Sequence, residues 1–397
     1  MWRDWVAQVD FDRMWAELEP VGRAPETGGY RRYAWTRADA TLREWFAGEA
    51  ERRGLDLTLD RAGNQWAWWG DPTAGGAVVI GSHLDSVPDG GAFDGPLGVV
   101  SALAAIDALR ATGGTPSRPI AVVNFGDEEG ARFGIACAGS RLITGALAPE
   151  RALALTDGDG TRLGEAMTTA GLDPAAVGPD RETLDRIGCF VELHVEQGRG
   201  LIDLGQSVAI GSAIWPHGRW RVELAGQANH AGTTRLVDRH DPMLELAGLV
   251  LQARQAAERH DAVATVGKVA VRPNGVNAIP SGVTAWLDAR GAGPAQVRAV
   301  IEELAASFPL EQESWTEETR FDGDLTERLR TVLPDAPVLA TGAGHDAGIL
   351  ANAGIPAGML FVRNPSGISH SPDEFAERDD CLAGVTALTT VVRTLAG

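Results

Sequence analysis

The first half of this 397-residue chain alternates short β-branched runs with longer helical patterns. The runs GAVVIGSHLD (76–85), PIAVVNFGD (119–127) and CFVELHVEQG (189–198) predict buried strands. Between the first two runs, residues from about 96 to 111 predict a helix. Strands that alternate with helices indicate a mostly parallel sheet of the doubly wound α/β class.

The pattern changes near residue 219, and the length of the chain exceeds what one core usually supports. The elements predicted there are a strand at RWRVELAGQ, a helix over 242–259, strands at AVATVGKVAV and GVTAWLDAR, a helix over 294–307 and a strand over 312–319. This β-α-β-β-α-β order is that of a small ferredoxin-like α+β domain. An apolar strand returns at AGMLFVRNPSG, so we expect residues 213–325 to be inserted in a larger domain of residues 1–212 and 326–397.

Composition excludes several classes of function. The chain has 35 Lys and Arg against 54 Asp and Glu, a net charge of −19, so it lacks the basic surface that nucleic acids require. An acidic surface also repels anionic membranes. No apolar run approaches the ~20 residues of a membrane helix, and the N-terminal MWRDWVAQVD lacks the layout of a signal peptide. We therefore expect a cytoplasmic protein with no nucleic-acid or membrane partner.

The cysteine, lysine and glycine residues argue against several other kinds of structural and binding site. The three cysteines, Cys137, Cys189 and Cys381, are widely spaced and predict reduced thiols rather than a disulfide framework or a structural zinc site. The single lysine, Lys268, lies in a predicted strand, so no P-loop is present. No Gly-x-Gly-x-x-Gly follows the first strong strand, which argues against an oxidoreductase.

Imidazole and carboxylate side chains follow four predicted strands of the larger domain. They include His83 with Asp94, Glu128 with Glu129, His194, and His370. Ligands of doubly wound sheets bind beyond the carboxyl ends of the strands, so these side chains should converge. Three imidazoles and two carboxylates exceed the ligands of one tetrahedral zinc and predict two metal ions. Asp94 is the expected bridge, because the Gly-rich DGGAFDG allows close approach of the backbone.

Two further carboxylates have predicted roles near the metals. Asp85 lies two residues after His83 and should accept its ring N–H, which fixes the tautomer. Of Glu128 and Glu129, one should bind metal, while the other acts as a general base that returns its proton to the leaving nitrogen. Their spacing alone leaves this order open.

Long motifs of the chain resemble those of the dinuclear-metal amidohydrolases that comprise allantoate amidohydrolase and N-carbamoyl-L-amino-acid hydrolase. The motifs are GSHLDSVPDGGAFDGPLGV, GDEEGARFG, ELHVEQG, GQANHAGTT, PNGVNAIP, TGAGHDA and GISHSP. The resemblance runs nearly end to end. It implies that His83, Asp94 and His194 bind one ion. It also implies that Asp94, Glu129 and His370 bind the other.

The same resemblance implies roles for five further residues. Glu128 is the general base. His230 stabilises the oxyanion across a dimer interface, which makes the protein a homodimer and the inserted domain a lid and dimerisation domain. Asn277 binds the substrate amide, and Arg290 binds its carboxylate. Gln197 contributes to substrate binding from the larger domain.

The implied activity is cleavage of a non-peptide C–N bond in an N-carbamoyl or ureido acid such as allantoate. Zinc, manganese, cobalt and nickel all suit mixed imidazole–carboxylate sites, with zinc or manganese expected. The alternatives are hydrolysis of another N-acyl amino acid, such as an N-formyl acid, an aminopeptidase-like activity, and an inactive metal-stabilised binding protein. A free Glu128 argues against the last. The roles of His345, Asp346 and Arg363 stay open; Arg363 is a candidate for setting side-chain preference.

Overall fold

The computed structural model describes residues 2–113 and 115–397; Met1, the first residue of the predicted larger domain, and Gly114 lie outside the described residues. The chain divides into two compact units, Met1–Ser212 with Arg320–Gly397, and Ala213–Thr319. This division differs from the predicted one at residues 320–325, which join the first unit. The backbone N–H groups of Phe321 and Asp322 donate to the carbonyls of Ser212 and Ala357, both at 3.1 Å.

The first unit is built around a nine-stranded sheet with the order β1-β2-β4-β3-β5-β15-β6-β13, in which β14 pairs with β6. The strands are β1 (Asp56–Leu59), β2 (Gln65–Trp69), β3 (Ala77–His83), β4 (Ile120–Phe125), β5 (Ile187–Val195), β6 (Val208–Ile214), β13 (Thr319–Arg320), β14 (Val338–Thr341) and β15 (Ala357–Val362). β3 pairs in parallel with β4 and β5, and β5 with β15. β2 and β6 join antiparallel. A mixed α/β fold with a parallel-rich central sheet is therefore confirmed.

The central strands are apolar along their whole length. All residues of β3, β4 and β15 are buried, as expected for parallel strands that are covered on both faces. β3 ends at the predicted ligand His83, β4 ends four residues before Glu129, and β15 ends eight residues before His370. The predicted strands thus have the right type and nearly the right bounds.

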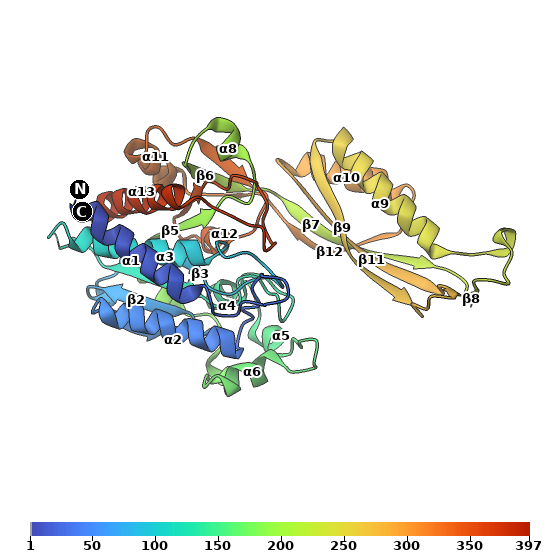
Figure 1. Ribbon diagram of the computed structural model, residues 1–397, viewed down its shortest axis with the longest axis horizontal. Helices are drawn as coiled ribbons and strands as arrows, with labels where there is room; N and C mark the ends of the chain where they lie inside the picture. Colours follow the sequence, from blue (N-terminus) through green and yellow to red (C-terminus); the bar gives the residue numbers. More distant parts are fainter. Residues whose placement is uncertain (1, 114) are drawn as a thin grey trace. The chain divides into compact units, whose positions relative to one another are not determined.

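Helices connect and cover these strands. They are α1 (Trp2–Leu18), α2 (Arg37–Arg52), α3 (Pro96–Arg110), α4 (Ala138–Thr144), α5 (Pro149–Leu153), α6 (Leu163–Thr169), α7 (Arg181–Leu184), α8 (Gly200–Leu204), α11 (Gly323–Val332), α12 (Asp346–Asn352) and α13 (Arg378–Ala396). α3 packs on β3 and β5, and α1 and α13 pack on α3 (Figure 1). Among the described residues, no helix has both the length and the apolar character needed to cross a bilayer.

The second unit has its own sheet and its own core. Its elements are β7 (His217–Ala225), β8 (Asn229–His230), α9 (Pro242–Arg259), β9 (Ala262–Arg272), β10 (Ala278–Ile279), β11 (Gly282–Gly291), α10 (Pro294–Ala305) and β12 (Leu310–Thr316). Four antiparallel strands lie in the order β12-β7-β11-β9, with β8 and β10 forming a separate pair. Apart from that pair, the element order is the β-α-β-β-α-β order expected from the sequence. Val222, Leu249, Leu287 and Val300 are fully buried in its apolar core.

Candidate metal centre

The predicted metal ligands lie at the carboxyl ends of β3, β4, β5 and β15. His83 is the last residue of β3, and His194 is the penultimate residue of β5. Glu129 follows β4, His370 follows β15, and Asp94 lies in the loop between β3 and α3. Loops that leave neighbouring parallel strands at one edge thus bring together residues far apart in the sequence.

These residues form two sets that share Asp94. Asp94 Oδ1 lies 3.5 Å from His83 Nε2 and 3.1 Å from His194 Nε2. The other oxygen, Oδ2, lies 3.5 Å from His370 Nε2, which is itself 3.7 Å from Glu129 Oε2. In each set, the potential ligand atoms lie within 4.8 Å of one another. The structure therefore brings all five predicted ligands together.

The side chains of both sets suit a divalent ion. Among the described residues, His83 Nε2, His194 Nε2 and Glu129 Oε1 are buried atoms that make no hydrogen bond. Leaving such an atom unpaired costs about 1–3 kcal/mol. Ligand atoms about 2.1 Å from a tetrahedral ion lie about 3.4 Å from one another. The separations of 3.1 and 3.5 Å between the imidazole nitrogens and Asp94 Oδ1 fit that geometry.

Backbone carbonyls orient the two buried imidazoles. His83 Nδ1 hydrogen-bonds the main-chain oxygen of Asp85 at 3.2 Å, and His194 Nδ1 hydrogen-bonds that of Val195 at 2.9 Å. A neutral ring that donates from Nδ1 presents Nε2 as its acceptor. In the neutral form that binds metal, both rings would therefore offer a lone pair on the side of Asp94.

The carboxylate of Asp85 lies beside the His83 ring, as expected, and also binds the backbone of the glutamate pair. It accepts the backbone N–H groups of Glu128 and Glu129 at 3.1 and 3.0 Å. Its Oδ1 lies 3.4 Å from His83 Nδ1, but the hydrogen bond of that ring goes to the Asp85 carbonyl. Asp85 thus anchors the turn that carries the glutamate pair.

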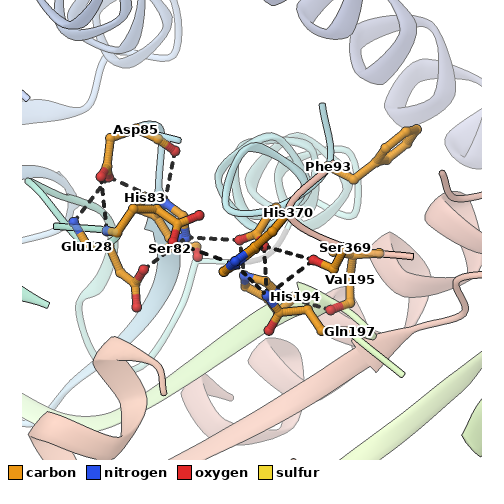
Figure 2. Close-up of polar contacts among 12 residues, drawn as sticks. Ser82, His83, Asp85, Phe93, Glu128, His194, Val195, Gln197, Ser369 and His370 are labelled. Carbon is orange, nitrogen blue, oxygen red and sulfur yellow. Dashed lines mark hydrogen bonds and ion pairs between the residues drawn. The ribbon is translucent and has the colours of Figure 1, made fainter. Parts of the chain in front are cut away.

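Glu128 lies beside the two sets and belongs to neither. Its side chain is buried, and its Oε2 lies 3.7 Å from His83 Nε2 (Figure 2). Burial, together with the carboxylates of Asp346 and Glu129, raises the pKa of Glu128 well above its ordinary value, while His83 opposes that shift. A buried carboxyl group next to a cation site is suited to accept and return a proton.

The electrostatic field at the centre favours positive charge. Burial lowers the pKa of His194, but the carboxylate of Asp94 outweighs burial and raises that pKa to about 9. Burial likewise raises the pKa of Asp94, yet His194 and His83 hold it well below its ordinary value. Carboxylates that attract a proton to these rings would attract a metal cation to the same place.

Gln197 lies on the His370 side of the centre (Figure 2). Its Nε2 donates to Asp94 Oδ2 at 2.7 Å and lies 3.3 Å from both Ser369 Oγ and His370 Nε2. The sequence predicts a substrate contact for Gln197, and that contact stays a prediction. In the structure, its amide holds the shared carboxylate in place.

Glu374 belongs to the candidate centre, although the sequence assigns it no role. Its Oε1 accepts the backbone N–H groups of Phe93 and Asp94 at 2.9 Å, and its Oε2 accepts the Ser369 hydroxyl at 2.9 Å. Burial and the charge of Asp94 raise its pKa to about 7. Glu374 therefore joins the loop of Asp94 to the loop of His370. The available signal was a carboxylate four residues after a ligand histidine.

The structure also places the residues whose roles the sequence left open. His345 packs on His194, with ring centroids 4.5 Å apart, and Asp346 accepts a hydrogen bond from the Ser140 hydroxyl. Arg363 donates two hydrogen bonds to Asp380, at 2.8 and 2.9 Å. This bidentate pair fixes Arg363 against α13.

Three predicted substrate residues belong to the second unit. His230 and Asn277 are exposed and adjacent, since the N–H of Ala231 donates to the Asn277 carbonyl at 2.9 Å. Arg290 forms an ion pair with Asp288 at 2.7 Å. It lies near the far end of β11, about 27 Å along that strand from its start near Asn277. The structure thus groups His230 with Asn277 and separates Arg290 from both.

A parallel-rich α/β sheet with two sets of metal-binding side chains at its carboxyl edge defines a candidate metallohydrolase. The chain belongs to peptidase family M20/M25/M40, whose model matches residues 79–394. It is 36% identical to the N-carbamoyl-L-amino acid amidohydrolase of Geobacillus stearothermophilus, over 98% of this chain and 99% of that protein. It is 32% identical to the allantoate amidohydrolase of Escherichia coli (strain K12), over 96% of each. A hydantoinase/carbamoylase family amidase from Burkholderia vietnamiensis has a similar crystal structure, with a TM-score of 0.86, 30% identity and 97% of each chain covered.

Proposed function

We propose that this protein hydrolyses a non-peptide C–N bond of an N-carbamoyl or ureido acid, with two divalent ions and with Glu128 as the general base. Allantoate and N-carbamoyl-L-amino acids represent the substrate class. One observation carries the proposal: a buried carboxylate, Glu128, lies beside two ligand sets that share Asp94 and takes part in neither. Binding alone does not require such a free base.

The enzyme class follows from the relatives. They are named N-carbamoyl-L-amino acid amidohydrolase and allantoate amidohydrolase, and they resemble this chain over nearly its whole length. The chain is a hydrolase of this type, acting on C–N bonds other than peptide bonds.

The two ligand sets would hold the ions. His83, Asp94 and His194 would bind one, and Asp94, Glu129 and His370 the other. When bound, such ions acidify water and polarise a carbonyl group, which makes hydrolysis at neutral pH accessible. Zinc and manganese suit these ligands best, and cobalt and nickel suit them as well.

The proton steps belong to Glu128. Its Oε2 would take a proton from the attacking water and deliver it to the nitrogen that leaves when the C–N bond breaks. Burial favours the neutral carboxyl, so Glu128 can hold the proton between the two steps. The Asp85 carboxylate accepts hydrogen bonds from the backbone N–H groups of Glu128 and Glu129, and these bonds hold Glu128 in position beside the ligands.

The arrangement of the second unit supports a homodimer with shared sites. Arg290 is the proposed carboxylate anchor, and His230 and Asn277 are the proposed contacts of the reacting group. Within one chain, about 27 Å of strand separates these groups, which is too far for one small acid. A dimer can bring these groups together, because Arg290 of one chain and His230 of the other can act on the same substrate. We therefore propose that the second unit is a lid and dimerisation domain.

A substrate panel tests the activity. Purified protein with added manganese or zinc is incubated with N-carbamoyl, N-formyl and ureido acids, and both ammonia and the acid product are measured. We expect ammonia from carbamoyl or ureido acids, and none from a Glu128→Gln protein purified in parallel. Cleavage of N-formyl or other N-acyl acids alone would replace the proposed substrate class with the alternative one.

Metal analysis tests the two-ion centre separately. Protein is exchanged into metal-free buffer, reloaded with zinc or manganese, and the bound metal per chain is measured. We expect two equivalents. A stoichiometry fixed at one or zero, with activity retained, would contradict the proposal.

A further inference from the structure

Cys137 contacts the proposed general base at two points. Its backbone N–H donates to the main-chain oxygen of Glu128 at 2.5 Å, and its Sγ lies 3.1 Å from Glu128 Oε1. The residue is 3% exposed and directly precedes α4. The simplest alternative is that this buried cysteine serves only as a small apolar residue. A purely apolar role does not account for a sulfur at hydrogen-bonding distance from a carboxylate.

The thiol is a hydrogen-bond donor in this contact. Burial and the neighbouring Glu128 raise the pKa of the Cys137 thiol well above its ordinary value, so the sulfur keeps its proton. A protonated thiol next to a carboxylate oxygen donates to it, although weakly. The hydrogen bond occupies Oε1 of Glu128. The second oxygen, Oε2, is the one that lies 3.7 Å from His83 Nε2.

The backbone conformation of Cys137 supports a specific role. Its φ of 54° and ψ of 37° lie in the left-handed region, and its side chain makes no capping hydrogen bond to α4. For a residue other than glycine this conformation costs about 1–2 kcal/mol, so its surroundings must hold it in place. Ser140 contributes to that, because its Oγ lies 3.2 Å from the Cys137 carbonyl and shares its one proton between that carbonyl and the closer Asp346.

We propose that Cys137 is a positioning residue for the hydrolysis: its thiol holds Oε1 of Glu128 and leaves Oε2 as the oxygen that exchanges the proton. The inference rests on the proposed function of Glu128 as the base. The thiol forms no covalent bond and gains or loses no proton. Its contribution is to restrict the carboxylate to one rotamer before substrate binds.

The first experiment detects the contact without any substrate. The S–H stretching band of Cys137 is recorded by infrared spectroscopy on full-length, zinc-loaded protein and is identified by its loss in Cys137→Ser. In the zinc-loaded protein the bound cations favour the carboxylate form of Glu128. A neutral amide replaces that carboxylate in Glu128→Gln, so the Cys137 band should move to higher frequency. The bands of Cys189 and Cys381, which lie elsewhere in the first unit, should stay where they are. A Cys137 band that does not move would overturn the proposal.

The second experiment measures the effect on catalysis. Cys137→Ala removes the donor, so kcat should fall about tenfold with KM and metal content unchanged. Cys137→Ser keeps a donor and should recover most of that loss. Cys189→Ala and Cys381→Ala remove the same atoms from other buried positions and are the matched controls, with kcat as in the wild type.

Each further outcome has a separate meaning. An unchanged kcat in Cys137→Ala, or a Cys137→Ser enzyme as slow as Cys137→Ala, would refute the positioning role. Loss of bound metal in Cys137→Ala would also refute it, because the residue would then support the fold of the centre. A fully active Glu128→Gln enzyme would instead refute the proposed base, whatever the infrared bands show.

Discussion

Asp94 is the residue on which both ligand sets depend. Its Oδ1 faces His83 and His194, while its Oδ2 faces His370 and accepts a hydrogen bond from Gln197. Two oxygens on one rigid carboxyl group fix the separation between the sets. A displacement of Asp94 therefore changes both sets together, and the residues that hold its loop matter as much as the ligands.

The first prediction concerns the glutamate pair. Glu128→Gln keeps the size of the side chain and removes the base, so kcat should fall about 100-fold or more while metal content stays normal. Kinetics and metal analysis on the same preparation check this. Glu129→Gln is the matched control and should lose bound metal instead. The reverse pattern would exchange the two roles.

A second prediction concerns the residue between Asp94 and α3. Gly95 has a φ of +84°, and a Cβ there would lie 2.4 Å from the His83 ring. Gly95→Ala should therefore displace His83 and weaken metal binding, as a metal titration would show. Gly354→Ala is the control, since Gly354 has a φ of +86° and no neighbour within 4 Å of the added Cβ.

Gly354→Ala should lower the free energy of unfolding by about 1–2 kcal/mol through the positive φ, and Gly95→Ala should lower it by more, because the added Cβ also meets the His83 ring. Only Gly95→Ala should also lower metal affinity. Equal metal affinity in the two variants would show that the His83 ring has room to move.

At the scale of elements, the candidate centre depends on hydrogen bonds between neighbouring loops. The loop after β3 carries Asp94, the loop after β15 carries His370, and Glu374 bonds to both loops. The strands set where each loop begins, but the positions of the candidate ligand atoms depend on hydrogen bonds between the loops. Glu374 thus holds the loop of Asp94 at a fixed distance from the loop of His370.

The third prediction tests this link. Glu374→Ala leaves the part-buried N–H of Phe93 and the buried N–H of Asp94 without their acceptor, and metal affinity should fall about 10- to 100-fold. Competition with a chelator measures the change. Asp373→Ala removes an exposed carboxylate next to it and should leave the affinity unaltered. Equal affinities would mean that the ligands hold their loops unaided.

The sequence predicts the strands better than it predicts these links. The buried runs that form β3, β4, β5 and β15 are continuous and apolar, so their type follows from local pattern, and His83 and His194 are placed by position alone. Glu374 has only a weak local signal, its place four residues after His370, because it acts on Phe93 and Asp94, which only the fold brings near. Cys137 has none, because a single cysteine has no pattern that predicts its hydrogen bond to Glu128. The antiparallel pair of β1 and β2 is short and was likewise not predicted.

At the scale of the whole molecule, the fourth prediction tests shared sites. Inactive Glu128→Gln chains are mixed with inactive His230→Ala chains under conditions that allow subunits to exchange. If sites are shared, each mixed dimer has one site with both defects and one with neither, so activity should return toward half per mixed dimer. The measurement is the rate of product formation by mixed dimers isolated with two different tags.

A matched mixture serves as its control. Glu128→Gln chains mixed with Glu129→Gln chains carry both defects in the first unit, so no mixed dimer has an intact site and activity should stay absent. If the His230→Ala mixture also stays inactive although exchange is confirmed, each site is built within one chain.

The position of β15 has a consequence for how the protein is made. β15 pairs with β5 in the middle of the sheet, yet the ribosome synthesises it only after the whole second unit. Until β15 emerges, β5 has an open edge, and such edges recruit strands from other chains. A nascent chain is therefore open to pairing with strands of other chains while the second unit is synthesised, and it lacks His370 until almost the entire polypeptide has been translated.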